Sequence, residues 1–148
     1  MLMSVFGRWF GRKDTPDSIT RVRGLMGGFI EACFVTIDAK SRQNPTDGRL
    51  MLLFMLGAID ILCQVHEIDK RASLALFESM LQEELGAYTP AQARAVLVEV
   101  VRATTDSNGQ RIMREGAESI RGWLTGISPP APHRLSELLN ELDAPPAR

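Results

Sequence analysis

Apolar and polar residues alternate along most of this chain with the spacing of an α-helix. Apolar positions recur every three or four residues, and the two-residue alternation of a half-buried strand never lasts more than a few positions. We therefore predict an all-α fold, a single-domain bundle of about five main helices over residues 15–126. The predicted helices span about 15–42, 50–66, 70–85, 90–101 and 112–124.

The most apolar stretch, Leu50–Cys63, has one charged residue, Asp60. A membrane-spanning helix needs about 20 consecutive apolar residues, and runs of 10–14 are more typical of buried core helices. The run here is interrupted after ten residues. We therefore predict that residues 50–66 form the central helix of the bundle, and that the chain has no transmembrane span.

Capping residues, proline and glycine mark the ends of the predicted helices. Thr15-Pro16-Asp17 is typical of a helix start, and Thr89–Gln92 has the pattern of a capping box with proline at the first helical position. Asn44–Gly48 predicts a turn. Gly86 and Gly126 are the predicted ends of two helices.

Small residues recur at every fourth position of the first predicted helix, at Gly24, Gly28 and Ala32. They would form a flat strip that a second helix can approach closely. A kink near Gly27 and Gly28 is the competing interpretation, because glycine pairs are common sites of helix kinks.

Composition is that of an ordinary globular domain, with 45% apolar and 24% charged residues among 148. The net charge of −1 gives no reason to expect a nucleic-acid partner. Charge is distributed unevenly, because residues 1–23 are rich in arginine and residues 60–99 are rich in carboxylates. Cys33 and Cys63 lie in apolar helical patterns, and we expect both to be reduced, buried and cytoplasmic; no secretory signal is evident.

The N-terminal segment, residues 1–13, combines aromatic and basic side chains. If it is helical, its aromatic residues share one side and its arginines lie nearby. Three interpretations stay open: docking on the bundle, peripheral contact with a membrane surface, and binding of a protein partner. The candidate partner- or membrane-binding residues of this segment are Phe6, Arg8, Trp9, Phe10 and Arg12.

Asp60 is the one carboxylate in the central apolar run, and we expect it to be structural. If it is buried and paired, Asp60→Leu should be tolerated, whereas Asp60→Ala should cost several kcal/mol. The alternative is a divalent-cation site, because oxygen ligands on facing helices suit hard cations. Its candidate ligands are Glu31, Asp38, Asp60 and Glu67.

Sequence motifs for catalysis or for other metals are incomplete. His66–Lys70 begins like a zinc-protease motif but has lysine in place of the second histidine. Residues 104–115 resemble a calcium loop, although Thr104 and Arg111 occupy positions that require a strong oxygen ligand and an apolar residue, so we predict a plain helix–helix turn. No nucleophile elbow, phosphate loop or dinucleotide motif occurs, and we do not expect an enzyme.

The C-terminal region, residues 127–148, has a proline-rich linker and a short amphipathic helix. The linker prevents the preceding helix from simply continuing, and a helix this short is unstable alone. Its leucines must therefore dock on the bundle, which we favour, or in the groove of a partner. These residues are Leu135, Leu138, Leu139 and Leu142.

Residues 56–81 resemble the centre of a TerB-like domain, a small helical family associated with tellurite resistance and stress response in bacteria. The resemblance consists of an apolar helix, an acidic turn at His66–Asp69, and a second helix with inward leucines. The Asp-Gly usual in that turn is replaced by His66-Glu67. The resemblance implies a compact helical bundle, cytoplasmic or at the inner membrane face, whose acidic surface binds ions or partners.

We therefore expect a bacterial, non-catalytic helical module that binds a protein partner or self-associates, without a cofactor. It would be cytoplasmic, with peripheral contact to the inner membrane through residues 1–13 as an option. The alternative is a TerB-like acidic domain that binds a divalent cation, conceivably with hydrolytic activity.

Overall fold

The computed structural model describes residues 16–37, 44–126 and 133–143, and every regular element in these ranges is an α-helix. This confirms the predicted all-α fold. The helices are α1 (Pro16–Phe34), α3 (Pro45–Val65), α4 (Lys70–Leu81), α5 (Pro90–Ala103), α6 (Ser107–Thr125) and α7 (His133–Asp143).

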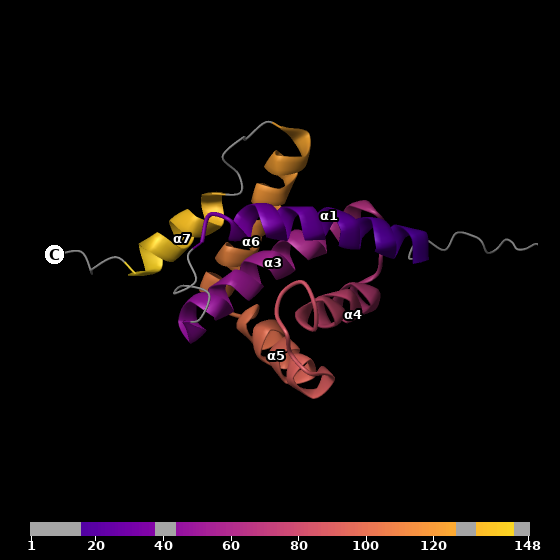
Figure 1. Cartoon of the computed structure of the whole chain (residues 1–148), viewed down its shortest axis with the longest axis horizontal. Helices are drawn as coiled ribbons and strands as arrows, with labels where there is room; N and C mark the ends of the chain where they lie inside the picture. The colour runs from indigo at the N-terminus through magenta and orange to yellow at the C-terminus, as the bar shows by residue number, and fades with distance from the viewer. Residues whose placement is uncertain (1–15, 38–43, 127–132, 144–148) are drawn as a thin grey trace, which may run out of the picture.

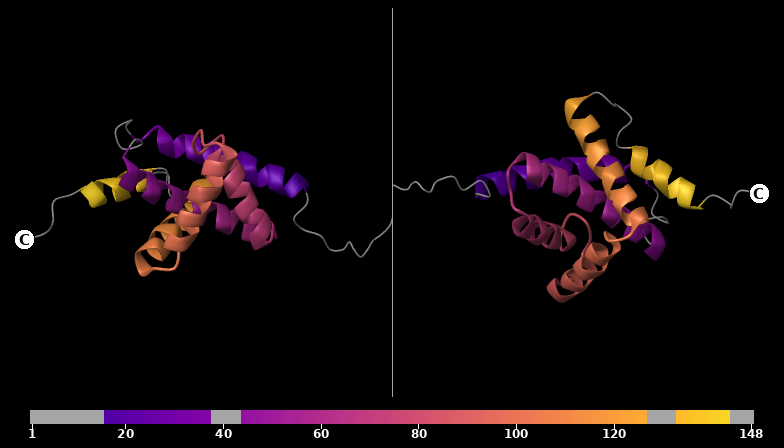
Figure 2. Two further views of the ribbon diagram at one scale, coloured as in Figure 1. Left: turned by 90° about the horizontal axis from the view of Figure 1, so that it is seen from below. Right: turned by 180° about the vertical axis from the view of Figure 1, so that it is seen from behind.

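Helix α3 is the centre of the bundle and contacts each of the other five described helices. Helix α1 lies along one side of α3 (Figure 1), and α6 crosses α3 on the opposite side, as the view from behind shows (Figure 2). Helices α4 and α5 cover a third side, and α7 packs near the first half of α3. The predicted arrangement around one central apolar helix is confirmed.

The hydrophobicity of α3 follows from this position. Every residue from Leu50 to Ile59 is buried. Among the described residues α3 is the one helix long and apolar enough to cross a membrane, but 67% of its most apolar window is buried inside the protein. Burial against the neighbouring helices accounts for much of its apolar composition.

The start of α3 differs from the sequence-based prediction. Residues 44–48 are not a separate turn, because Pro45 is the first residue of the helix. Asn44 is the N-cap, and its side-chain oxygen accepts hydrogen bonds from the amides of Thr46 (2.9 Å) and Asp47 (3.1 Å). Asn-Pro suits both a turn and a capped helix start, so the local pattern could not decide between them.

Two other helices end earlier than predicted. Helix α1 ends at Phe34 instead of continuing toward residue 42, and the Thr36 hydroxyl hydrogen-bonds to the Cys33 carbonyl at 2.7 Å in the turn that follows. Helix α4 ends at Leu81, and the amide of Leu85 bonds to the Met80 carbonyl at 2.8 Å, so that the chain turns before Gly86. Apolar spacing persists through both turns, which is why the pattern overestimated the helix lengths.

The closest approach between helices is at Gly57 of α3 and Gly116 of α6. A Cβ at Gly57 would lie 2.0 Å from the Met113 carbonyl oxygen, and one at Gly116 would lie 1.9 Å from the Phe54 carbonyl oxygen. The strip predicted on α1 is not such a crossing. A Cβ at Gly24 would meet nothing within 4 Å, and Gly28 faces the side chain of Trp123 at 3.2 Å instead of another helix backbone.

Candidate functional site

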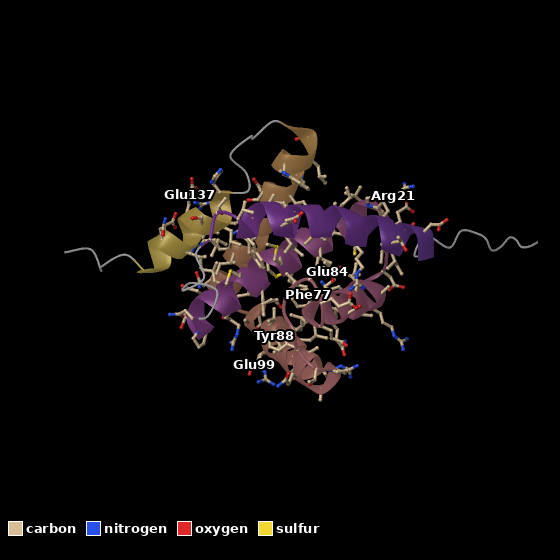
Figure 3. All side chains as sticks on the ribbon, in the orientation of Figure 1. Arg21, Phe77, Glu84, Tyr88, Glu99 and Glu137 are labelled. Atoms are coloured by element: carbon tan, nitrogen blue, oxygen red, sulfur yellow. The ribbon has the colours of Figure 1, made fainter. Side chains whose placement is uncertain are left out.

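A groove is lined by the second half of α1, the first half of α3 and the connection between α4 and α5. It consists of two adjoining hollows, of about 370 and 520 Å³, that share Phe34 and Glu84. We call it the acidic groove. Figure 3 labels Glu84 and Tyr88 on the α4–α5 connection, where Glu84 lies directly below α1 in that view.

The floor of the acidic groove is apolar. Helix α3 contributes Met51, Leu52 and Met55, and the α4–α5 connection contributes Leu85 and Tyr88. These α3 residues and Leu85 are at most 9% exposed, so the half-buried rings of Phe34 and Tyr88 and the exposed Val35 supply most of the accessible apolar surface of the groove.

Gly86 gives the Tyr88 ring its place in the groove. A Cβ at residue 86 would lie 2.8 Å from the ring of Tyr88, so a larger residue would displace the ring. The Tyr88 amide also bonds to the Leu81 carbonyl at the end of α4, at 3.4 Å. The early end of α4 and the glycine together position an aromatic side chain against α3.

The rim of the acidic groove carries three carboxylates, Glu31, Glu83 and Glu84, and one guanidinium, Arg23, bonds to its edge. Arg23 holds Glu84 through two hydrogen bonds, of 2.7 and 2.8 Å, and donates a third to the Ser79 hydroxyl at 2.8 Å. Its hydrogen bonds lower the pKa of Glu84 below the usual value of 4.5.

Glu83 and Glu31 keep the rim negative. Glu83 lies 3.4 Å from Arg23 with 73% of its side chain exposed, and Glu31 is exposed on α1. Three carboxylates against one guanidinium leave a net charge of −2 around an apolar floor. This combination favours a ligand with apolar anchors and positive charges.

The proposed carboxylate cluster does not form among the described residues. No three histidine, cysteine or acidic side chains in that part of the chain are arranged to hold a metal ion. Glu31 lies on the rim of the acidic groove, whereas Asp60 bonds to Lys70 (3.1 Å) and Gln64 (2.9 Å). Asp38 lies outside the described residues. Glu31 and Asp60 therefore do not face one another, because the polar stripe of α3 faces the start of α4 instead of α1. The divalent-cation site stays the alternative prediction.

Asp60 is paired with Lys70, but it is not fully buried, so the condition set for the larger mutational cost is met only in part. Its side chain is 25% exposed, and that of Lys70 is 64% exposed. The stripe that begins at Asp60 reaches the surface at Gln64, so water can solvate both members of the pair.

The two cysteines and His66 have structural surroundings. Both cysteines are buried and free of disulfides. Burial raises the pKa of Cys33 to about 12, and burial is also the main cause of the raised pKa of Cys63. Neither thiol is therefore activated as a nucleophile. His66 caps the end of α3, where its Nδ1 lies 3.0 Å from the Leu62 carbonyl oxygen.

Only residues 104–106 of the segment that resembles a calcium loop form the predicted helix–helix turn, and residues 107–115 are the first part of α6. Asp106 is the N-cap of α6, and its carboxylate accepts a hydrogen bond from the Gly109 amide at 2.7 Å. A Cβ at residue 109 would lie 2.0 Å from the Ala103 carbonyl oxygen, so the turn requires glycine for close approach.

The C-terminal leucines dock on the protein's own bundle. Leu135, Leu138 and Leu139 are at most 2% exposed and belong to the main core. Arg134 fixes α7 to α6 through two hydrogen bonds to Glu115, of 2.9 and 2.7 Å. These leucines are therefore not a partner-binding surface in this structure. The side chain of Leu142 lies outside the described residues.

The aromatic and basic candidates of the N-terminal segment also lie outside the described residues. They are Phe6, Arg8, Trp9, Phe10 and Arg12. The acidic excess of residues 60–99 is evident in the sequence, but the acidic groove itself is not. Glu83, Glu84 and Gly86 were visible as an acidic pair before a glycine, whereas their position beside Phe34 and Met51 depends on the packing of three helices.

No family model, curated protein or solved structure matches this chain. Residues 56–81 form two helices joined by a turn. Membership of that family stays a prediction.

Proposed function

We propose that this protein is a non-catalytic interaction module that binds an amphipathic segment, one with aromatic and basic side chains, in the acidic groove. The observation that carries the proposal is the accessible apolar surface of Phe34, Val35 and Tyr88 beside the carboxylates of Glu31 and Glu83. The proposal places the module in the cytoplasm, in agreement with its two reduced cysteines.

An amphipathic helix binds a groove by burying its apolar face and leaving its charged face in water. Aromatic side chains supply most of the binding energy at such surfaces, because they bury a large area with few rotatable bonds. Carboxylates on the rim steer a basic ligand toward the groove and discriminate against acidic ones. The acidic groove offers both components over one continuous surface.

Titration of a fluorescent synthetic helix, with leucine and tryptophan on one face and lysine and arginine on the other, tests this function. We expect saturable binding that the double variant Glu31→Lys/Glu83→Lys weakens by about tenfold or more, since two rim charges are reversed. Tyr88→Ala should also weaken binding, because it removes part of the floor.

The matched control is Glu118→Lys, a charge reversal at an exposed residue of α6 on another side of the molecule. It should leave the affinity for the synthetic helix within about twofold of the wild-type value. Equal affinities for the wild-type protein and the double rim variant at low salt would exclude the acidic groove as the binding site.

A further inference from the structure

We infer that residues 1–13 of this chain are themselves a ligand of the acidic groove, and that they occupy it within the same molecule. This inference rests on the proposed function, and it adds a regulatory element to it. An external partner would then have to displace the protein's own N-terminal segment before it could bind.

Chemical complementarity is the first argument. The segment supplies three aromatic side chains, Phe6, Trp9 and Phe10, and a cluster of positive charges that includes Arg8 and Arg12. The acidic groove supplies an apolar floor and a rim with a net charge of −2. The charge signs are opposite, and both surfaces combine aromatic or apolar groups with charges at their edges.

Chain length is the second argument. Helix α1 begins at Pro16, and its groove-lining residues Gly27 and Glu31 lie 11 and 15 positions further along. At a rise of about 1.5 Å per residue, these positions are roughly 16 and 22 Å from the start of α1. The anchors Phe6, Trp9 and Phe10 precede Pro16 by ten, seven and six residues, so an extended chain can carry them about 33, 23 and 20 Å from the start of α1. The segment can therefore run back along α1 and reach the groove without a second molecule.

The path along α1 carries little electrostatic penalty. Arg21 and Arg23 lie between the start of α1 and the groove. Glu84 neutralises Arg23 through two hydrogen bonds, and Arg21 lies above α1 in Figure 3, whereas Glu84 lies below it. The next charges toward the groove are the carboxylates of Glu83 and Glu31, which attract the basic segment.

Covalent attachment makes a weak contact effective. A ligand joined to its site by a short linker experiences an effective concentration in the millimolar range. At an effective concentration of about 1 mM, a segment with an intrinsic dissociation constant of about 0.1 mM would occupy the groove in about 90% of the molecules. An external ligand would bind about tenfold more weakly than it binds an open groove.

The test compares two full-length variants in their binding of a labelled synthetic peptide of residues 1–13. One is Phe6→Ser/Trp9→Ser/Phe10→Ser, which removes the anchors of the internal ligand. The matched control is Val65→Ser/Val98→Ser/Leu124→Ser, which removes three apolar side chains that are 67%, 46% and 42% exposed elsewhere. Helical circular dichroism spectra verify that both variants are folded.

We expect the first variant to bind the peptide about tenfold more tightly than the wild-type protein, and the control variant to match the wild type. Addition of Glu31→Lys/Glu83→Lys to the first variant should abolish this gain. Equal peptide affinities in the wild-type protein and the first variant would overturn internal occupancy. The proposed function would still hold in that case if the rim substitutions Glu31→Lys/Glu83→Lys weaken peptide binding. Peptide binding that ignores the rim charges would overturn both.

Two further measurements separate other roles of the segment. Sedimentation that shows a dimer dependent on Trp9 would place the segment in a second copy and overturn the intramolecular form. The second measurement is co-sedimentation with anionic phosphatidylserine vesicles. If the wild-type protein binds the vesicles, the first variant does not, and both have the same peptide affinity, the segment is a membrane anchor and the inference is overturned.

Discussion

At the scale of single residues, Glu67 has an unusual backbone conformation. Its φ is +58°, in the left-handed region, where it terminates α3. The Ile68 amide donates a hydrogen bond to the Cys63 carbonyl oxygen at 2.7 Å, and the Glu67 amide donates one to the Gln64 carbonyl oxygen at 3.1 Å. This pair of bonds defines a Schellman motif, in which the left-handed position is usually glycine.

At position 67, glycine should therefore give a more stable protein than alanine. We expect Glu67→Gly to be more stable than Glu67→Ala by about 1 kcal/mol, because a Cβ is disfavoured in the left-handed conformation. Urea unfolding measures the difference. At the exposed helical residue Ala95, the order should reverse, with Ala95→Gly less stable by about 1 kcal/mol. Equal stability of the two Glu67 variants would contradict this account of the turn.

Asp60 should contribute less to stability than the sequence suggested. Because its pair with Lys70 is partly solvated, we expect Asp60→Ala to cost less than about 1 kcal/mol, in the range of surface ion pairs. The larger penalty expected from sequence applies to a fully buried pair. Chemical denaturation of Asp60→Ala and Lys70→Ala, separately and combined, measures the coupling; a loss of several kcal/mol would mean that Asp60 is buried in solution.

At the scale of helices, the crossing of α3 and α6 is the tightest contact in the described structure that glycine permits. At Gly57 and at Gly116, a backbone carbonyl group of the other helix lies where the Cβ of a larger residue would be. Around this crossing, Phe29 stacks on Phe54 with ring centres 6.2 Å apart and contacts Trp123 at 5.5 Å. One pair of small residues thus determines how three helices meet.

Alanine at either crossing glycine should be destabilising. We expect Gly57→Ala and Gly116→Ala to cost about 1–3 kcal/mol or more, because the helices must separate to admit the methyl group. Gly24→Ala is the matched control. It should stabilise the protein by up to about 1 kcal/mol, since its Cβ meets nothing and alanine favours the helix. Thermal unfolding of the three variants distinguishes these directions.

Removal of α7 should expose the core. Deletion of residues 128–148 removes three leucines that are at most 2% exposed, and leaves their counterparts on α3, α1 and α6 uncovered. We expect binding of a hydrophobic dye and self-association, which fluorescence and sedimentation measure. A truncated protein that is monomeric and as stable as the full chain would contradict the docking of α7.

At the scale of the whole molecule, two arginine–carboxylate pairs connect helices that are distant in sequence. Arg23 joins α1 to the end of α4 through Glu84, and Arg134 joins α7 to α6 through Glu115. Hydrogen bonds from the arginines lower the pKa of both glutamates below 4.5. Each arginine is bidentate, a geometry that strengthens an ion pair.

Acid should therefore destabilise the folded state through these pairs. Because the folded-state pKa values are depressed, this stability is present above pH 4.5 and is lost as the pH falls through the lower folded-state values. Denaturation between pH 6 and about pH 3 should show a shallower loss in Glu84→Gln and Glu115→Gln than in the wild type. Glu118→Gln, outside both pairs, serves as the control; identical pH profiles for all variants would refute the assignment.

The sequence by itself determined the fold class and several of the helix starts and ends. Periodic apolar residues can be buried together only on one side of a helix, so the all-α architecture and the central position of α3 follow from spacing alone. Local capping chemistry is equally self-contained, and the Thr89–Gln92 capping box forms as its residues predict. Docking of α7 also followed, because its leucines required cover.

Tertiary structure alone decided which surfaces meet. Spacing on one helix cannot say which neighbour lies opposite, so the sequence could not decide whether Glu31 lies near Asp60, and it did not predict the crossing at Gly57 and Gly116. The acidic groove has the same origin: Phe34, Met51 and Glu84 come from three segments, and they form one surface only because α1, α3 and the α4–α5 connection pack together. Contacts between distant segments depend on the packing of all helices at once, and no local pattern encodes them.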